Sequence, residues 1–304
     1  MKHNLNVIAQ EEYHLLERII EMKSKNELTP KELAEKEKYL ANYNGPDKII
    51  SSHEMMQKIM AENVLDIKID TGYPSLEKHI KGIVPGQLIV VSGQTGSGKT
   101  LFLQSLTRNI TKQNFRVCWF SYELPPKQFL FCFPQLPAFY APEIIKESDL
   151  MWLEERTWEA MLKYDIKVVM IDHLHYLVDM AKDQNISWGV GRVLRKLKRL
   201  AIEHNIVVFL ICHTGKKDRI EKKVELSGDD IRDSSFCTQE PDTVLMIWRT
   251  KDELDRVDEA VIKIEKSRLT GVQDKLFTVK KIKGYLEELK FDTEPDDADM
   301  FTNP

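Results

Sequence analysis

A glycine-rich segment in the first half of the chain carries the residue types that bind phosphate groups. Its spacing from Gly93 to Thr100 matches the pattern G-x-x-x-x-G-K-[ST]. Glycine adopts positive φ angles without strain, so consecutive backbone N–H groups can turn toward phosphate oxygens. The ammonium group of Lys99 reaches the β- and γ-phosphates, and the hydroxyl of Thr100 can ligate Mg²⁺. We therefore expect ATP or another NTP to bind, with Mg²⁺, to the loop residues Gly93, Gln94, Thr95, Gly96, Ser97, Gly98, Lys99, Thr100 and Leu101.

Three further polar side chains each follow a run of apolar residues, where strands of a parallel sheet would end. The carboxylate of Glu123 can orient and deprotonate the water that attacks the γ-phosphate. Asp172 is predicted to hold Mg²⁺ through water or through the Thr100 hydroxyl. His213 can sense the γ-phosphate and act on the loop that follows it. The residue types alone leave open that Glu123 is merely solvated, that Asp172 is structural and that His213 is a hydrogen-bonded core histidine.

The elements that must position these residues follow from the apolar pattern. Residues 88–91 form a continuous apolar run within an expected strand at 88–92, which is followed by an expected helix at 99–114 and a strand at 117–121. The order strand, helix, strand favours a parallel sheet with right-handed crossovers, which binds ligands at the carboxyl ends of its strands. The pattern continues with helices at 150–164 and 189–204, strands at 167–172, 206–213 and 243–248, and later hairpin strands at 260–266, 275–279 and 285–289.

The two ends of the chain differ in composition from this central part. Residues 1–67 are predicted to be helical, with Thr29 and Ser51 as N-terminal caps, and we interpret them as an accessory or oligomerisation region. Residues 291–304 are acidic and poor in apolar residues, so we expect a disordered tail. An acidic segment with an aromatic residue, Phe301, suits a basic groove on a replication partner. A purely solubilising tail fits the same composition.

The overall composition excludes several classes of protein. Of the 304 residues, 42 % are hydrophobic and 30 % are charged, which is typical of globular proteins. No apolar run is long enough to span a membrane and the N-terminus lacks a signal-peptide core, so we expect a cytoplasmic protein. A phage-encoded protein in a host cytoplasm and a protein of an organellar matrix are both consistent with this expectation. The net charge of −4 requires any nucleic-acid site to be a local basic patch. Four cysteines without close pairing are expected to be free thiols: Cys118, Cys132, Cys212 and Cys237.

Several short strings of residues together resemble one family. Residues 120–125 (FSYELP), 169–177 (VMIDHLHYL) and 197–201 (LKRLA) look like the core of DnaB-type hexameric replicative helicases. Residues 211–213 (ICH) and 264–271 (IEKSRLTG) are similar to the phage primase–helicase and Twinkle branch of that family. The resemblance covers about residues 68–290. It implies an α/β fold with a RecA-like P-loop NTPase core and a mostly parallel central sheet.

The resemblance also implies roles that spacing alone does not assign. Lys266 and Arg268 would reach the γ-phosphate bound by a neighbouring subunit and stabilise its charge during hydrolysis. Arg249 would stack on the nucleotide base. A pair of exposed basic residues on a strand is the simpler alternative for Lys266 and Arg268.

DNA is expected to be contacted by the loops that follow Asp172 and His213. Basic side chains on the second loop would hold the phosphates of single-stranded DNA without reading its sequence. Because Asp218 and Glu221 lie among them, a solvated charged loop is also consistent with the pattern. The basic residues are Lys216, Lys217 and Arg219.

These features together predict an ATP-dependent DNA helicase or translocase that acts on single-stranded DNA in replication. Its subunits would form a ring, most simply a hexamer, because each nucleotide site needs a neighbour. The segment between Glu123 and Asp172 is shorter than in the replicative helicases, and neither a primase nor a large N-terminal collar domain is detected. A RecA- or RadA-like recombinase filament therefore remains an alternative, and a regulatory ATPase that switches partners is another.

Overall fold

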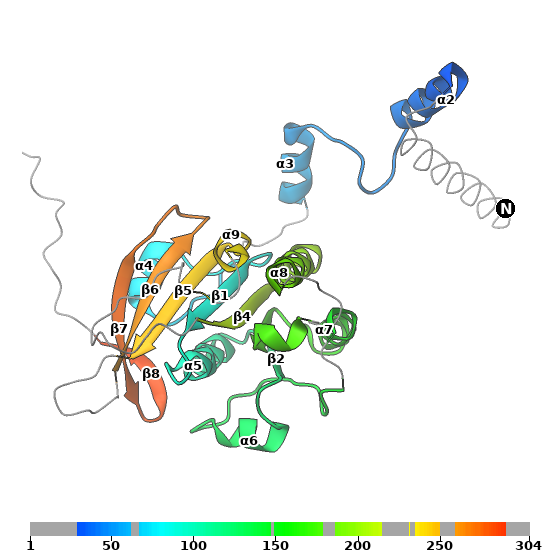
Figure 1. Ribbon diagram of the computed structural model, residues 1–304. Coiled ribbons are helices and arrows are strands. Elements are labelled where there is room, and N and C mark those ends of the chain that lie inside the picture. The colour runs from blue at the N-terminus through cyan, green and yellow to red at the C-terminus, as the bar shows by residue number, and fades with distance from the viewer. Residues whose placement is uncertain are drawn as a thin grey trace, which may run out of the picture. The chain divides into compact units, whose positions relative to one another are not determined.

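The computed structural model describes residues 29–61, 67–146, 149–178, 186–214, 231, 235–249 and 259–289. The chain divides into two compact units, Met1–Leu65 and Asp66–Pro304, and each is described by itself (Figure 1). The helices predicted within residues 1–28 and the tail predicted at 291–304 lie outside the described residues. Among the helices that are described, none is long and apolar enough to cross a membrane.

Two helices make up the described part of the first unit, and both begin at the predicted caps. Before α2 (Pro30–Ala41), Thr29 forms a capping box with Glu32, in which each side chain accepts from the other residue's backbone N–H. Before α3 (Ser52–Ala61), the Oγ of Ser51 accepts a backbone N–H of the first turn (3.1 Å). Within the described residues, neither helix buries a side chain, so capping supplies the local stability that packing does not.

One eight-stranded sheet forms the centre of the second unit, in the order β2-β3-β4-β1-β5-β6-β7-β8. The strands from β2 to β5 in this order are parallel, and β6, β7 and β8 continue the sheet as antiparallel hairpins. Figure 1 shows β7, β6, β5, β1 and β4 side by side. The strand bounds are β1 Leu88–Gly93, β2 Val117–Ser121, β3 Val168–Asp172, β4 Val207–His213, β5 Thr243–Arg249, β6 Glu259–Ser267, β7 Lys275–Ile282 and β8 Tyr285–Glu288.

Helices cover both faces of this sheet. They are α4 Pro74–Ile80, α5 Lys99–Lys112, α6 Pro126–Phe131, α7 Leu150–Tyr164, the 3₁₀ helix η1 Leu174–Leu177, α8 Ile186–Glu203 and α9 Phe236–Gln239. In β1, Ile89 and Val91 pack into a core with α4 and α5, whereas Leu88 and Val90 pack on the other face with α7 and α8. A strand that is buried on both faces must be apolar throughout, which explains the continuous apolar runs in the sequence.

Several elements end at other residues than the sequence predicts. Helix α5 stops before Asn114, because that residue adopts a φ of 66°, which is left-handed. Helix α8 begins earlier than predicted, at Ile186. Strand β7 continues past residue 279 because Ile282 pairs with Tyr285 of β8. These differences leave the predicted order and type of the elements unchanged.

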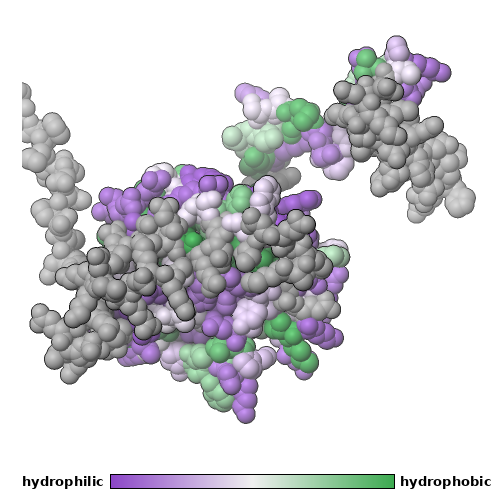
Figure 2. Space-filling view, in the orientation of Figure 1, coloured by the Kyte–Doolittle hydropathy of each residue, from purple (hydrophilic) through white to green (hydrophobic). Residues whose placement is uncertain are grey.

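A short helix and an aromatic cluster occupy the beginning of the segment between β2 and α7. Phe129 of α6 packs against Trp119 of β2 and against Phe133 (ring centres 4.9 and 5.3 Å away). On the outer side, Leu130 and Phe131 are exposed, and Figure 2 shows hydrophobic residues over α6 on a largely hydrophilic face. This compact arrangement lies in the segment that the sequence predicts to be shorter than in the replicative helicases.

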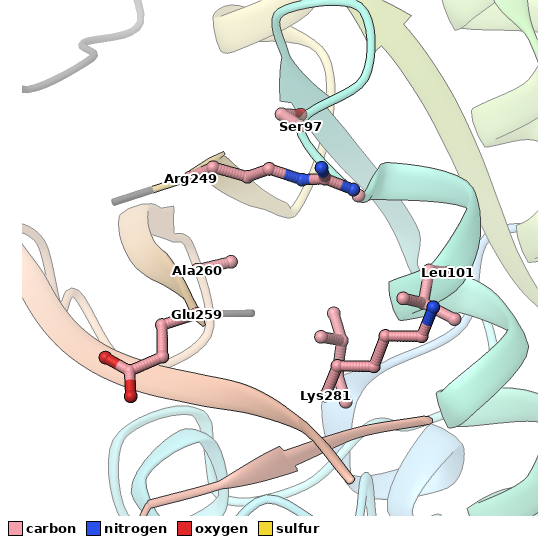
Figure 3. A pocket seen from close by; sticks show the side chains of 8 residues that line it. Ser97, Leu101, Arg249, Glu259, Ala260 and Lys281 are labelled. Atoms are coloured by element: carbon pink, nitrogen blue, oxygen red, sulfur yellow. The ribbon is translucent and has the colours of Figure 1, made fainter. Parts of the chain in front are cut away.

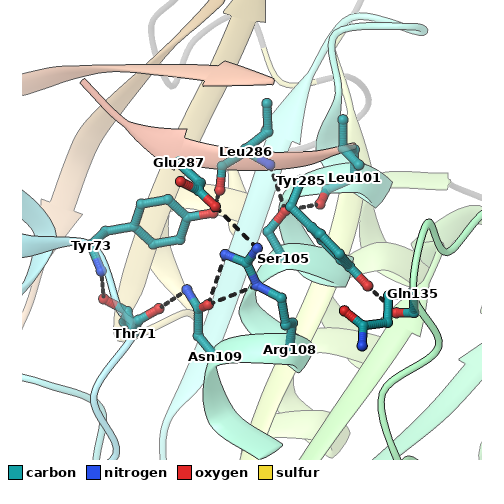
Figure 4. A network of polar contacts seen from close by, with 10 residues as sticks. All are labelled: Thr71, Tyr73, Leu101, Ser105, Arg108, Asn109, Gln135, Tyr285, Leu286 and Glu287. Atoms are coloured by element: carbon teal, nitrogen blue, oxygen red, sulfur yellow. Dashed lines mark hydrogen bonds and ion pairs between the residues drawn. The ribbon is translucent and has the colours of Figure 1, made fainter. Parts of the chain in front are cut away.

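The edge strand β8 is fastened to the helix that follows the glycine-rich loop (Figure 4). The Oγ of Ser105 on α5 accepts a hydrogen bond from the backbone N–H of Leu286 (2.9 Å). The hydroxyl of Tyr73 donates to the carbonyl of Leu286 (2.9 Å), and Arg108 forms an ion pair with Glu287 (3.2 Å). These contacts hold α5 in place, and therefore also the loop from which it starts.

Replacing Ser105 by alanine is expected to lower the free energy of unfolding by about 1–3 kcal/mol, because the buried N–H of Leu286 loses its acceptor. Chemical denaturation followed by tryptophan fluorescence measures this change. Thr111→Ala is the matched control, since the Thr111 hydroxyl donates to carbonyls of its own helix. Equal losses in the two variants would contradict the role given to the Ser105–Leu286 bond.

Candidate active site

The glycine-rich loop joins β1 to α5 at the carboxyl end of the parallel strands. Gly93 ends β1 and pairs with His213, which ends β4. The backbone of β5 passes so close that a Cβ atom at Gly93 would lie 2.1 Å from the carbonyl oxygen of Ile247. Gly98 has a φ of 102°, a left-handed conformation that favours glycine. Backbone geometry therefore requires both glycines, and the N-terminus of α5 that follows them favours an anion.

The side chain of Lys99 is buried beneath the loop and holds it in shape. Its Nζ donates to the carbonyl oxygens of Gly93 (2.9 Å) and Gln94 (2.8 Å). Burial lowers the pKa of Lys99 to about 8, although the negative charges of Asp172 and Glu123 oppose this effect. The negative charge of a triphosphate in the loop would likewise raise the pKa of Lys99. The ammonium group would therefore be fully charged when an anion is bound.

Thr100 and Asp172 meet between the first turn of α5 and the end of β3. The Oγ1 of Thr100 donates to Oδ2 of Asp172 (2.7 Å). The other carboxylate oxygen, Oδ1, is buried and has no hydrogen-bond partner in the described part of the chain. A hydroxyl beside a carboxylate with an uncommitted oxygen offers the ligands that Mg²⁺ prefers, so this pair fits the predicted magnesium site.

The burial of Asp172 makes the stability of the nucleotide-free protein depend on pH. Burial raises the pKa of Asp172 to about 6, an effect that the Thr100 hydrogen bond opposes. The folded carboxyl thus keeps its proton up to about pH 6, whereas the unfolded one loses it near pH 3.8. The stability that the protonated Asp172 contributes to the folded state is therefore fully present below about pH 4 and is lost as the pH rises through 6.

Replacing Asp172 by asparagine is expected to raise the free energy of unfolding by about 2–3 kcal/mol at pH 7.5, since the buried charge is removed. Thermal unfolding without nucleotide and with a chelator present checks this. The difference between variant and parent protein should shrink toward zero near pH 4, where both side chains are neutral. A variant that is no more stable than the parent at pH 7.5 would contradict the assignment of a buried charge.

A carboxylate and two imidazoles meet at the ends of β2, β3 and β4. The Nδ1 atom of His173 lies 3.7 Å from Oε2 of Glu123, and its ring centre lies 4.4 Å from that of His213. Burial lowers the pKa of His173 to about 3, and the smaller effects of the charges of His213, His175 and Lys99 act in the same direction. The imidazole of His173 is therefore neutral near pH 7. The side chain of Glu123 is 42 % exposed, so it can reach a water molecule above the loop. The structure therefore brings the predicted residues Glu123 and His213 together beside the loop.

Two residues of this cluster, His173 and His175, were not among the predicted site residues. His173 contacts both Glu123 and His213, and its ring centre lies 5.4 Å from that of His175. The run D-H-x-H that starts at Asp172 is visible in the sequence, where two histidines directly after a buried strand could have indicated them.

A hollow beside the loop is lined by residues from the antiparallel part of the sheet. Arg249, at the end of β5, lines this hollow together with Gly98 and Leu101. Glu259 and Lys281 also line the hollow, and Figure 3 shows the Lys281 side chain extending toward Leu101. No motif marks these two residues in the sequence, because β6 and β7 reach the loop only through strand pairing. The hollow adjoins the loop and is lined by two cations, the carboxylate of Glu259 and an apolar wall.

Lys266 and Arg268 lie together at the opposite end of the sheet from the loop. Strand β6 runs antiparallel to β5, so its last residues lie beside the first residues of β5. The Nζ of Lys266 donates to the carbonyls of Thr238 (2.7 Å) and Gln239 (3.0 Å), and Arg268 donates to that of Gln239 (2.8 Å). The structure thus places both cations next to each other but does not bring them to the loop of their own chain.

The segment predicted to bind DNA starts and ends beside the same site. Thr214 donates its N–H to the carbonyl of Gly93 (3.2 Å) and forms an antiparallel bridge with Ile231. The two described residues that flank this segment therefore lie side by side, with Thr214 next to the glycine-rich loop. The predicted DNA-binding residues Lys216, Lys217 and Arg219 lie outside the described residues.

A glycine-rich loop between a buried strand and a helix, with an acid at the end of a nearby strand, defines a P-loop nucleotide-binding protein. The chain matches the model of the DnaB-like helicase C-terminal domain over residues 68–132 and 142–285. It therefore belongs to this family, which confirms the predicted resemblance. The match does not support the recombinase alternative. It omits residues 133–141, which lie in the segment predicted to be short.

Curated relatives named as replicative DNA helicases match the chain at low sequence identity. A probable plasmid replicative DNA helicase of Chlamydia psittaci is 24 % identical over 214 residues, which are 60 % of this chain and 46 % of that protein. The replicative DNA helicase DnaB of Pasteurella multocida is 23 % identical over 243 residues, or 67 % of this chain and 50 % of that protein. The chain thus spans about half the length of these relatives.

Two solved structures share the fold. One of them, an ATPase domain, superposes with a TM-score of 0.67 at 15 % identity, covering 78 % of this chain and 97 % of that chain. The other structure is described as a DnaB-like replicative helicase and its interactions with primase. It superposes with a TM-score of 0.64 at 17 % identity, covering 93 % of this chain and 77 % of that chain. The likeness confirms the predicted α/β fold with a RecA-like core and a mostly parallel sheet.

Proposed function

We propose that this chain is the motor of a ring-forming DNA helicase, which hydrolyses ATP or another NTP to move along single-stranded DNA in replication. The observation that carries the proposal is the contact between Thr100 and Asp172 beside Glu123, in a chain of the DnaB-like helicase C-terminal domain family. Residues 68–290 would form the motor, and residues 1–67 would be an accessory or oligomerisation region.

Within one subunit, different side chains would bind the nucleotide and perform the chemistry. Lys99 would exchange the loop carbonyls for the β- and γ-phosphates, while backbone N–H groups of the loop hold other phosphate oxygens. Thr100 and Asp172 would hold Mg²⁺, which neutralises phosphate charge when it is bound. The exposed carboxylate of Glu123 would orient the attacking water and accept its proton.

Each nucleotide site would be completed by the next subunit. Lys266 pairs with Val244, whereas Arg249 beside the loop lies about 16 Å further along β5, at about 3.3 Å per residue. Lys266 and Arg268 therefore lie away from the nucleotide site of their own chain, and we expect them to act on a nucleotide bound by a neighbour. A closed ring, most simply a hexamer, repeats this head-to-tail contact without leaving a free end.

The site would be coupled to DNA through the end of β4. His213 lies level with Gly93, and the next residue, Thr214, begins the segment with the predicted DNA contacts. A phosphate that enters or leaves beside His213 would thus displace the start of that segment and shift the bound strand. We also propose that the acidic tail at 291–304 would bind a replication partner in the cytoplasm through the aromatic side chain of Phe301.

A strand-displacement assay tests this proposal. The purified chain should separate a tailed duplex only with NTP and Mg²⁺, and single-stranded DNA should stimulate hydrolysis. The stimulation should weaken as salt rises, because the contacts are made to phosphates, and it should be lost in the double variant Lys216→Ala/Lys217→Ala. Hydrolysis that keeps its specific rate on dilution to monomers and ignores added DNA would overturn the proposal.

A further inference from the structure

Three side chains of types that bind transition metals end three neighbouring strands. Glu123 follows β2, His173 follows β3 and His213 ends β4. Each offers one ligand atom, and these atoms all lie within 4.8 Å of one another. Because the three strands are consecutive in a parallel sheet, the fold itself fixes their spacing.

The distances suit a small four-coordinate ion. Zinc binds imidazole nitrogen and carboxylate oxygen at about 2.0–2.2 Å, which places neighbouring ligand atoms about 3.3 Å apart. The Nδ1 of His173 is already 3.7 Å from Oε2 of Glu123, and the rings of His173 and His213 are 4.4 Å apart. The exposed side chain of Glu123 can rotate, so modest side-chain movements close the remaining gap.

The chemistry of the ligands separates this cluster from the magnesium pair. Thr100 and Asp172 offer oxygen atoms alone, which Mg²⁺ prefers. Two imidazoles and one carboxylate are the ligands of open zinc sites, in which water takes the fourth position. The affinity of such a set rises along the divalent series toward Cu²⁺ and remains high for Zn²⁺. Excess Mg²⁺ would therefore not displace a transition metal from the cluster.

We propose that Glu123, His173 and His213 form a second metal site that binds Zn²⁺ or a similar transition-metal ion and thereby blocks hydrolysis. The ion occupies the lone pairs of Glu123, so this carboxylate no longer accepts the proton of the attacking water. The blocking effect rests on the proposed catalytic role of Glu123, whereas the metal site rests on geometry alone. The protein with an occupied second site still binds nucleotide through Lys99 and Thr100.

Cobalt titration of the full chain without nucleotide tests the site directly. Co²⁺ substitutes for Zn²⁺, and its visible absorption intensifies in four-coordinate sites. We expect one Co²⁺ per chain, displaced by Zn²⁺ but not by excess Mg²⁺. His173→Gln, His213→Gln and Glu123→Gln should each weaken binding by more than about tenfold. His204→Gln, a histidine just after α8, is the control and should leave binding unchanged.

Three outcomes would overturn the site: no four-coordinate cobalt spectrum, ligand variants that bind Co²⁺ as tightly as the parent protein, or a loss in the His204 control as large as in the ligand variants. If a histidine variant fails to fold, Glu123→Gln decides alone, because its exposed side chain lies outside the core. In the parent protein, Zn²⁺ at saturation should reduce hydrolysis in excess Mg²⁺ by at least tenfold, and an unchanged rate would overturn the blocking effect. A protein that binds Co²⁺ at these residues but hydrolyses no NTP retains the metal site and contradicts only the proposed function.

Discussion

Replacing Glu123 by glutamine is expected to lower the rate of NTP hydrolysis by about 10²–10⁴-fold while nucleotide binding persists. The amide keeps the size and the hydrogen-bonding shape of the carboxylate but cannot accept a proton from water. Binding should persist because Lys99, Thr100 and Asp172 remain in place. Single-turnover hydrolysis measures the loss of chemistry, and a fluorescent nucleotide measures the affinity.

The matched control for this variant is Glu155→Gln on α7, which removes an exposed carboxylate far from the loop along the chain. It should leave the hydrolysis rate within about twofold of the parent protein, because surface substitutions of this kind change little. A Glu123→Gln protein that hydrolyses NTP at the control rate would show that another group activates the water. His173, 3.7 Å away, would then be the next residue to test.

The residues of the loop and the strand ends could be predicted because local rules govern them. Gly98 needs a positive φ and Gly93 cannot accommodate a side chain, so the motif reports backbone geometry directly. Asp172 and His213 end apolar runs, and parallel strands bring such ends to one edge. The same reasoning gave the parallel part of the sheet, because strands buried on both faces are apolar throughout.

Residues that reach the site from the antiparallel strands could not be predicted in this way. Glu259 and Lys281 line the hollow because β6 and β7 pair beside β5, and no local pattern records that pairing. The ends of elements also escaped prediction where a single conformation decides them, as at Asn114. Tertiary pairing is non-local, so a single sequence indicates which segments form strands but not which of those strands adjoin the loop.

Replacing Arg268 by alanine is expected to lower the hydrolysis rate of assembled rings by about 10³-fold, the cost of losing a cation that stabilises the transferred phosphoryl group. Nucleotide affinity should change little, because Arg268 lies at the far end of the sheet from its own loop. The side chain is 52 % exposed, so its ion pair with Asp242 adds at most about 1 kcal/mol to stability. Arg199→Ala, which removes an exposed arginine paired with Glu203, is the control and should hydrolyse normally.

Mixing two inactive variants shows in which subunit Arg268 acts. Arg268→Ala subunits keep an intact loop, whereas Lys99→Ala subunits keep an intact Arg268. In rings assembled from equal amounts, about a quarter of the interfaces join an intact loop to an intact Arg268, so up to about a quarter of the parent rate should return without DNA. If the mixture forms rings but stays as inactive as either variant alone, Arg268 does not act across the interface. The sheet geometry predicts the recovery, since Arg268 and Lys266 lie at the opposite end of the sheet from the loop of their own chain.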